Sequence, residues 1–353
     1  MPVAVTASMT AYFIRRLLLV IPTFVGITIM VFAITRFVPG GPMERIIANA
    51  RQMQAMGPGG GAIAGPGGAG AGQPLSQEQI ERLRVYYGFD KPLLTSYVLW
   101  LGKVLQGNLG RSTRYYDPVW DMIKERIPIS LYFGILTTLI VYGVCIPLGI
   151  AKAIGHRSHF DNVTSIIIFT GYAIPGWVAG VMMLVLFSSN MDLFPLGGLV
   201  SDFFQEMTLL EKARDISWHT LLPLLAYVLG SFTVMTLLMK NTLMDNLGAD
   251  YVRTAVAKGL SFKQAVFRHA LRNSLIPIAT HFGNNVSIIL MGSFLIEKVF
   301  NINGMGLLGY ESVVDRDYPV VMGILVISSL LFMLGNILSD ICVALVDPRV
   351  RFK

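Results

Sequence analysis

Six apolar stretches divide the sequence, and each is long enough to cross a membrane as a helix. They run approximately over Tyr12–Thr35, Ile129–Ile154, Thr164–Phe187, Leu221–Lys240, Ile276–Ile296 and Pro319–Val346. A hydrocarbon core about 30 Å thick needs roughly 20 apolar residues in a helix. Because only helices and closed barrels satisfy every backbone hydrogen bond inside lipid, stretches of this length favour helices. The sequence therefore predicts an all-α membrane protein with six spans.

The composition supports a surface that faces lipid. The 353 residues are 54% hydrophobic and only 14% charged, whereas soluble domains carry about a quarter charged residues. The net charge is +7. The basic residues cluster beside the apolar stretches, which is typical of membrane orientation and argues against nucleic-acid binding. Cys145 and Cys342 lie inside apolar stretches, so we interpret them as packing residues without a metal.

The charges between the stretches predict that both termini lie in the cytoplasm. The connections after the second and fourth stretches are basic, as is the C-terminal tail, whereas the connections after the third and fifth are acidic. Positive charge is retained on the cytoplasmic side of a membrane. The cytoplasmic basic residues include Lys152, Arg157, Lys240, Arg253, Lys258, Lys263, Arg268, Arg272, Arg349, Arg351 and Lys353.

A long external loop is predicted between the first two spans. Residues 1–35 form a cytoplasmic tail and the first span, residues 36–127 form the external loop, and residues 128–353 form a five-span core. Within the loop, residues 57–72 hold nine glycines and no charge. Such a segment cannot bury enough surface to fold, so it is expected to be a flexible tether.

The same loop is expected to contain a small helical lobe. Ser76 and Gln79 form a capping-box pattern that opens a helix, and Gly88 would end it. Two interpretations of this lobe remain open. It is either a stabilising cap on the bundle or a dock for a partner that delivers substrate.

The connection between the fourth and fifth stretches predicts two short amphipathic helices on the cytoplasmic face. Asp250 is positioned to cap the first helix. The apolar face of this helix comprises Val252, Ala255 and Val256. Gly259 follows and fits the left-handed position that ends a helix.

The second helix is predicted from the capping-box pattern of Ser261 and Gln264. Its apolar side carries Phe262, Ala265, Val266 and Ala270. Two short helices joined at a glycine cannot span a bilayer, so we expect them to lie at the surface and contact another protein. The alternative is a membrane-surface hairpin whose basic residues meet anionic lipid.

This connection resembles the EAA loop of ABC-importer permeases. The similarity is to the dipeptide and oligopeptide branch, because Arg253 stands where the general motif has Glu. The matching residues are Tyr251–Ala255, Ala257–Gly259, Arg268–Asn273 and Ile276-Pro277. Matching motifs follow in order along nearly all the chain, at Ile14–Leu18, Pro39–Pro42, Tyr87–Pro92, Gly107–Ser112, Phe194–Val200, Gly306–Glu311, Arg316–Pro319 and Val346–Arg349. Three of these, Phe194–Val200, Gly306–Glu311 and Arg316–Pro319, most resemble the B-type permeases of Yej-type importers of oligopeptides and the peptide antibiotic microcin C.

The resemblance implies a type I ABC-importer permease of the bacterial inner membrane, with a coupling-helix loop at 241–276. The partners implied are a second homologous permease, one or more cytoplasmic ATPase subunits, a periplasmic peptide-binding protein and a peptide. ATP and Mg²⁺ would be used by the ATPase, because Gly102-Lys103 lacks the upstream glycine of a Walker A motif. The residues implied in ATPase coupling are Arg253, Thr254, Ala255, Ala257, Lys258, Gly259 and Arg268.

Polar residues inside the spans are candidates for the substrate pathway, because polar groups are costly in lipid and face a bundle interior. They are His281, Asn284, Asn285 and Ser287 in the fifth stretch and Asp340 in the sixth. The alternative for the first four is hydrogen bonding between helices. Asp340 is expected either to pair with a basic residue or to line the inner vestibule.

Three other functions would require different features of the sequence. A secondary transporter driven by an ion gradient would need several paired acids inside the spans, and Asp340 is nearly alone there. A membrane enzyme would need a nucleophile or metal constellation, and only His281 is well placed; no catalytic residue is predicted. A structural subunit of a membrane complex is compatible with ATPase contact but not with a substrate pathway.

Overall fold

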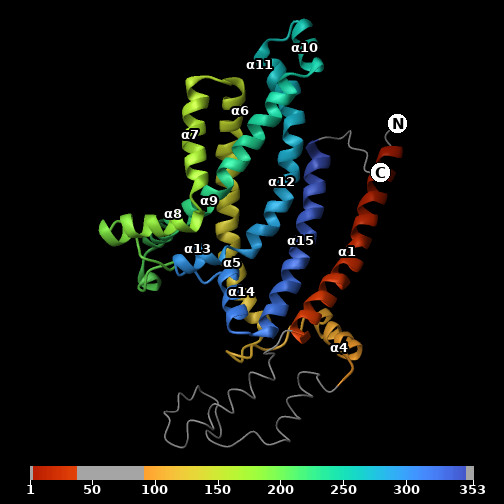
Figure 1. Cartoon of the computed structure of the whole chain (residues 1–353), viewed down its shortest axis with the longest axis vertical. Helices are drawn as coiled ribbons and strands as arrows, with labels where there is room; N and C mark the ends of the chain where they lie inside the picture. Colours follow the sequence, from red (N-terminus) through yellow and green to blue (C-terminus); the bar gives the residue numbers. More distant parts are fainter. Residues whose placement is uncertain (1–2, 38–90, 347–353) are drawn as a thin grey trace, which may run out of the picture. The chain divides into compact units, whose positions relative to one another are not determined.

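The computed structural model describes residues 3–37 and 91–346, except for the side chains at 3–13, 34, 35, 37 and 283–291. Within these residues the regular elements are helices, apart from one isolated β-bridge between Arg111 and Pro118 (Figure 1). The all-α prediction is therefore confirmed. The glycine-rich segment 57–72 and the expected helix between Ser76 and Gly88 lie outside the described residues.

The helices follow the apolar stretches, with several π-helical turns between them. In chain order they are α1 (Val3–Phe37), α4 (Leu93–Leu105), α5 (Val119–Ile140), η1 (Val141–Cys145), α6 (Ile146–Ile154), α7 (His159–Ala173), α8 (Gly176–Met183), η2 (Leu184–Asn190), η3 (Phe204–Glu206), α9 (Leu209–Leu247), α10 (Asp250–Ala257), α11 (Phe262–Ala265), η4 (Val266–Ala270), α12 (Leu271–Met291), α13 (Phe294–Val299), α14 (Met305–Val314) and α15 (Tyr318–Val346).

Four continuous helices have the length and hydropathy of membrane spans among the described residues. They are Ile14–Ala33 within α1, Val119–Ile154, α9 and α15. The third predicted stretch corresponds to α7 and the α8–η2 helix, which together are apolar enough for one span but meet at an angle of 90°. The fifth predicted stretch falls on α12, which has 21 residues.

A 90° bend interrupts the span that was expected over Thr164–Phe187. Ile174 is extended, with φ −97° and ψ 117°, and Pro175 follows it as the N-cap of α8. A residue before proline is disfavoured in the helical region, and proline lacks the N–H that would continue the helix. The helix consequently stops and restarts in a new direction, as a broken span or a re-entrant loop.

The chain divides into two compact units. The major unit comprises Met1–Ile21, Lys124–Tyr310 and Ser328–Lys353, and the minor unit comprises Pro22–Ile123 and Glu311–Ile327. In the major unit, α9 packs against α6, α7, α8 and α12 (Figure 1). With 39 residues at 1.5 Å each, α9 is about 58 Å long and exceeds the hydrocarbon core. Its two ends therefore reach beyond the membrane interior.

The minor unit is organised by contacts between segments distant in sequence. The Tyr97 hydroxyl on α4 lies 3.0 Å from the Thr28 hydroxyl on α1. The Asp317 carboxylate accepts hydrogen bonds from the Ser112 hydroxyl and, at 3.0 Å, from the Thr113 backbone N–H. Two motifs that matched the importer permeases, at 107–112 and 316–319, thus meet at one buried carboxylate.

Candidate functional site

The first cytoplasmic helix of the predicted coupling loop is present as α10. Its N-cap is Ala249, so Asp250 lies in the first helical turn and does not cap the helix as expected. Gly259 has a φ of +97° just after the helix, which confirms the predicted left-handed position. A side chain there would be strained, although a Cβ would meet no atom within 4 Å.

The two faces of α10 differ sharply. Val252 and Ala255 are buried in a core cluster shared with the end of α9 and with η4. Burial of an aliphatic side chain such as Val252 contributes roughly 1.5–3 kcal/mol, which anchors the helix to the bundle. Val256, expected on the apolar face, is instead exposed together with Tyr251. The outward face therefore combines exposed apolar and basic side chains, and the polar groups of Tyr251 and Arg253 contact the nearby Asn246 and Asp250.

The second predicted helix begins as expected but does not end before the fifth span. Ser261 and Gln264 form both hydrogen bonds of a capping box. From Phe262 the backbone stays helical through η4 and into α12. The prediction of a separate second surface helix was wrong, because nothing breaks the chain between Ala265 and Leu271 except a π-helical turn. Motion of this segment would consequently pass directly into α12.

The residues implied in ATPase coupling separate into two groups. Ala255 is buried and holds α10 against the bundle. The others are exposed and form the outward surface: Arg253, Thr254, Ala257, Lys258, Gly259 and Arg268. Phe262, expected on the apolar side of the second helix, is also exposed.

An ion cluster lies where α6, α7 and α9 approach one another, and sequence reasoning did not find it. The Asp161 carboxylate accepts hydrogen bonds from Lys240 Nζ at 2.8 Å to each oxygen. Lys152 Nζ lies 3.0 Å from Asp161 Oδ1. The Lys152 side chain is fully buried and donates further hydrogen bonds to the Thr164 and Ser165 hydroxyls at 2.7 and 2.8 Å. The cluster joins the α6–α7 turn to α9 at Lys240, ten residues before α10 begins at Asp250.

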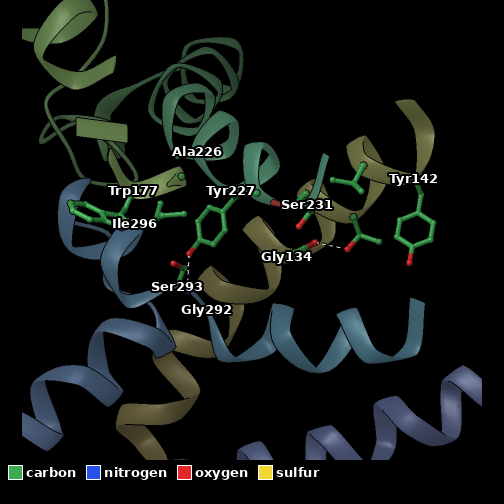
Figure 2. Close-up of a pocket in the computed structure, with 14 residues that line it drawn as sticks. Gly134, Tyr142, Trp177, Ala226, Tyr227, Ser231, Gly292, Ser293 and Ile296 are labelled. Atoms are coloured by element: carbon green, nitrogen blue, oxygen red, sulfur yellow. Dashed lines mark hydrogen bonds between the residues drawn. The ribbon is translucent and has the colours of Figure 1, made fainter. Parts of the chain in front are cut away.

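A cavity of about 290 Å³ lies inside the major unit. Its wall comes from α5 and η1, the start of α8, the middle of α9 and the segment after α12. Figure 2 shows Trp177 and Tyr142 at opposite ends, with Tyr227 and Ser231 between them. The lining residues are Gly134, Thr137, Thr138, Val141, Tyr142, Gly176, Trp177, Ala226, Tyr227, Gly230, Ser231, Gly292, Ser293 and Ile296.

The cavity wall has hydroxyls but no charge among the residues that line it. The Tyr227 hydroxyl accepts a hydrogen bond from the Ser293 backbone N–H at 3.2 Å (Figure 2) and donates one to Glu297 Oε1 at 3.3 Å. The Thr138 hydroxyl donates to the Gly134 carbonyl at 2.9 Å. Thr137 Oγ1 is buried and has no hydrogen-bond partner in the described part of the chain.

Glu297 lies behind Tyr227 and is only 1% exposed. Its Oε2 accepts a hydrogen bond of 2.7 Å from the Leu307 backbone N–H, near the start of α14. Burial raises the pKa of the Glu297 carboxyl above its ordinary value, and the hydrogen bonds from Leu307 and Tyr227 oppose that rise. A Cβ at Gly304 would lie 2.6 Å from the carboxyl carbon of Glu297, so glycine is required there.

Among the predicted pathway residues whose side chains the structure describes, neither His281 nor Asp340 lines this cavity. His281 is partly buried on α12, and the side chains of Asn284, Asn285 and Ser287 lie outside the described residues. Asp340 forms an ion pair with Arg16 on α1, which agrees with the basic-partner alternative. The lining residues were missed because they are mostly glycine, serine, threonine and aromatic residues scattered over four segments, and no local pattern links them.

Comparison with protein families gives a match over most of the described core. The model of a family described as "Binding-protein-dependent transport system inner membrane component" matches residues 145–352. This range begins inside the second span and includes α10 and the ends of α9 and α12 that flank it.

Individual relatives match over nearly the full chain. An inner membrane ABC transporter permease protein YejB from Escherichia coli O157:H7 is 41% identical over 98% of this chain and 100% of the relative. A peptidoglycan transport system permease protein YejB from Agrobacterium fabrum is 40% identical over 98% and 99%, respectively. An oligopeptide transport system permease protein AppB from Bacillus subtilis is 33% identical over 98% and 100%.

Proposed function

Because the chain belongs to the family of binding-protein-dependent transport system inner membrane components, we propose that it is the membrane subunit of an ATP-driven importer of oligopeptides. The relatives are named as permeases of oligopeptide and peptidoglycan transport systems and as YejB. We include microcin C-like peptides in the proposed substrate class. The direction of transport is from the periplasm to the cytoplasm.

One observation supports this function best: α10 is anchored on one face and open on the other. Val252 and Ala255 fix it to the bundle, while Arg253, Lys258 and Arg268 are exposed. An exposed surface with aromatic, apolar and basic residues on a short, rigidly held helix suits a protein partner. The proposed partner is a cytoplasmic ABC ATPase, which uses ATP and Mg²⁺ while this subunit carries no ATPase site.

The remaining partners follow from the same importer architecture. A second homologous permease completes the pathway, and a periplasmic peptide-binding protein delivers the peptide. Both termini of this chain are proposed to lie in the cytoplasm, since α10 lies between the fourth and fifth stretches and would face the ATPase. The proposed residues of the substrate pathway remain His281, Asn284, Asn285, Ser287 and Asp340.

Coupling is proposed to act through α9 and α12, the two helices that flank the coupling loop. Closure of the ATPase pair would move α10, whose core contacts reach the ends of both helices. The Asp161 cluster ties α9 to the α6–α7 turn, so the same motion would reach these helices. Packed helices that shift together are typical of rigid-body switching between inward-facing and outward-facing states.

Cross-linking at α10 tests the ATPase contact. Arg253→Cys places a thiol on the exposed face, and the buried Ala255 is unsuitable for this purpose. In the assembled complex, a bifunctional thiol reagent should capture the ATPase from residue 253. The control Asp202→Cys, at an exposed position in the connection before α9, should not capture it. Absence of any ATPase product from residue 253 in a complex that retains the ATPase would contradict the proposal.

Reconstitution separates this function from the ion-driven alternative. The purified complex in vesicles should take up a labelled peptide with ATP and the binding protein, and it should not do so with a proton or sodium gradient alone. Uptake driven by the gradient without ATP would identify a secondary transporter. A complex that binds the ATPase but moves no peptide under either condition would support a structural subunit.

A further inference from the structure

The pocket of the major unit is large enough to hold one side chain of a peptide. Its volume is about 290 Å³, and a water molecule takes about 30 Å³, so it holds roughly ten waters. Sites for whole drug-sized ligands span roughly 300–1,000 Å³. The pocket lies at the lower limit of that range, so a single leucine, glutamine or aromatic side chain fits inside it.

The chemistry of the wall excludes a charged occupant. None of its fourteen lining residues is charged, and an unpaired charge is expensive in an apolar environment. Glu297 does not provide a free counter-ion, because its carboxylate is occupied by the Leu307 N–H and the Tyr227 hydroxyl. The rings of Trp177 and Tyr227 offer aromatic contact to an uncharged group.

The hydroxyls distinguish a peptide side chain from a lipid chain as the occupant. Thr137 Oγ1 is buried and unpartnered within the described residues, and a buried hydroxyl without a hydrogen bond is costly. A lipid acyl chain would leave that cost in place. A side chain with a neutral polar group can relieve it, and Ser231, which is exposed on the same wall, offers a second hydroxyl.

We propose that this cavity receives one uncharged side chain of the transported peptide and gives this subunit a side-chain preference of its own. This inference rests on the proposed importer function. It assigns selectivity to the membrane subunit in addition to any selectivity of the binding protein that delivers the peptide.

The test fills the cavity without disturbing its wall. Gly230 lines the cavity, is exposed, and a Cβ there would meet no atom within 4 Å. Gly230→Leu therefore adds volume without a backbone clash, and replacing glycine inside a helix favours the helix. The control is Gly26→Leu in α1, where the glycine is also exposed, helical and free of atoms within 4 Å but does not line the cavity.

Uptake is measured in vesicles that contain the complete importer, with saturating binding protein and ATP. The substrates are tripeptides Ala-X-Ala in which X is Gly, Leu, Gln or Lys. For each peptide the rate of the variant is divided by the rate of the wild type, so that selectivity of the binding protein cancels. Gly230→Leu should lower uptake about tenfold for X = Leu and Gln, and should leave X = Gly unchanged, as should Gly26→Leu for every peptide.

A second variant probes the unpartnered hydroxyl. Thr137→Val keeps the shape of the side chain and removes the hydroxyl, so it should lower the Gln-to-Leu uptake ratio about threefold to tenfold. Abundance in the membrane should stay at the wild-type level, since no hydrogen bond within the described residues is lost.

The outcomes separate this inference from the function on which it rests. An equal loss for all peptides in Gly230→Leu, or no change in any ratio, overturns the inference while ATP-driven uptake by the wild type stands. A phospholipid that co-purifies with the wild type, is lost in Gly230→Leu, and leaves uptake unchanged identifies a lipid site and also overturns it. Absence of ATP-driven uptake of any peptide by the wild-type complex overturns both proposals.

Discussion

Asp161 and Glu297 are both almost completely buried in the major unit, but only Asp161 lies beside cations. Two lysines, Lys152 and Lys240, contact the Asp161 carboxylate at 2.8–3.0 Å. The Glu297 carboxylate is instead held by the Leu307 N–H at 2.7 Å and the Tyr227 hydroxyl at 3.3 Å. One carboxylate is thus balanced by charge and the other by dipoles.

The two arrangements suit different tasks. Where α6, α7 and α9 approach one another, long lysine side chains connect three helices, and removal of the Asp161 carboxylate leaves the buried Lys152 ammonium without a counter-ion. Beside the cavity, glycines at 292, 304 and 306 bring the backbone close to Glu297, so the carboxylate is fixed by shape. The Asp161 site therefore depends on ion pairing, and the Glu297 site depends on the absence of side chains around the carboxylate.

The largest effect is expected from Asp161→Asn. This change leaves the fully buried Lys152 ammonium and Lys240 without a carboxylate, which should lower the free energy of unfolding by about 3–5 kcal/mol. The measurement is the denaturation midpoint of the purified protein in detergent, together with its abundance in the membrane. The matched control Asp245→Asn, at an exposed position on the same helix as Lys240, should change the midpoint little.

A double variant identifies the cause of that loss. Asp161→Asn combined with Lys152→Met should recover at least half of the lost stability, because it removes the fully buried ammonium group of Lys152. Failure to recover any stability would mean that Asp161 acts through its hydrogen bonds to the α6–α7 turn rather than through charge balance.

An intermediate effect is expected from Gly304→Ala. The new Cβ would lie 2.6–2.7 Å from three atoms of the Glu297 carboxyl group, and overpacking of this kind costs about 1–3 kcal/mol. At Gly155, in the turn beside Asp161, a Cβ would lie 3.2 Å from the Ser158 hydroxyl and 3.3 Å from the Ala151 carbonyl, so Gly155→Ala should cost less. The same denaturation measurement applies, and Gly143→Ala, where no atom lies within 4 Å, is the control. Equal losses of stability for Gly304→Ala and Gly155→Ala would contradict the view that close packing fixes Glu297 whereas ion pairs fix Asp161.

A smaller effect is expected from Glu297→Gln. The amide keeps the shape and one acceptor oxygen, and no cation is left unpaired among the described contacts of Glu297, so the loss should be about 1–2 kcal/mol. The observable is again the denaturation midpoint, compared directly with that of Asp161→Asn. A loss as large as that of Asp161→Asn would show that Glu297 has a cationic partner.

The parts of the fold that sequence predicts are those with a local cause. The capping box of Ser261 and Gln264 spans three residues, and the left-handed Gly259 follows the end of one helix. The apolar stretches likewise predict helices because each stretch carries its own signal. The short helix α10 and the glycine after it were therefore predicted correctly, although the exposure of Val256 was not.

The parts that sequence does not predict arise from distant partners. Lys240 and Asp161 are 79 residues apart, and Tyr227 and Glu297 are 70 apart, so no window of the sequence contains either pair. The direction of the chain after Pro175 also depends on what α8 packs against, namely α9 and α13. Proline predicts that the helix is interrupted, but the 90° angle is set by tertiary packing.

The smallest effect on stability is expected from Arg253→Ala, which extends the comparison to an exposed ion pair. Arg253 lies 3.7 Å from Asp250 on α10, but the two side chains are 74% and 98% exposed. Exposed pairs contribute about 0–1 kcal/mol, so the denaturation midpoint should hardly move. If Arg253 binds the ATPase, the same variant should nevertheless lower peptide-stimulated ATP hydrolysis by the complex several-fold. Reduced stability with normal ATP hydrolysis would show that Arg253 stabilises the fold and does not take part in coupling.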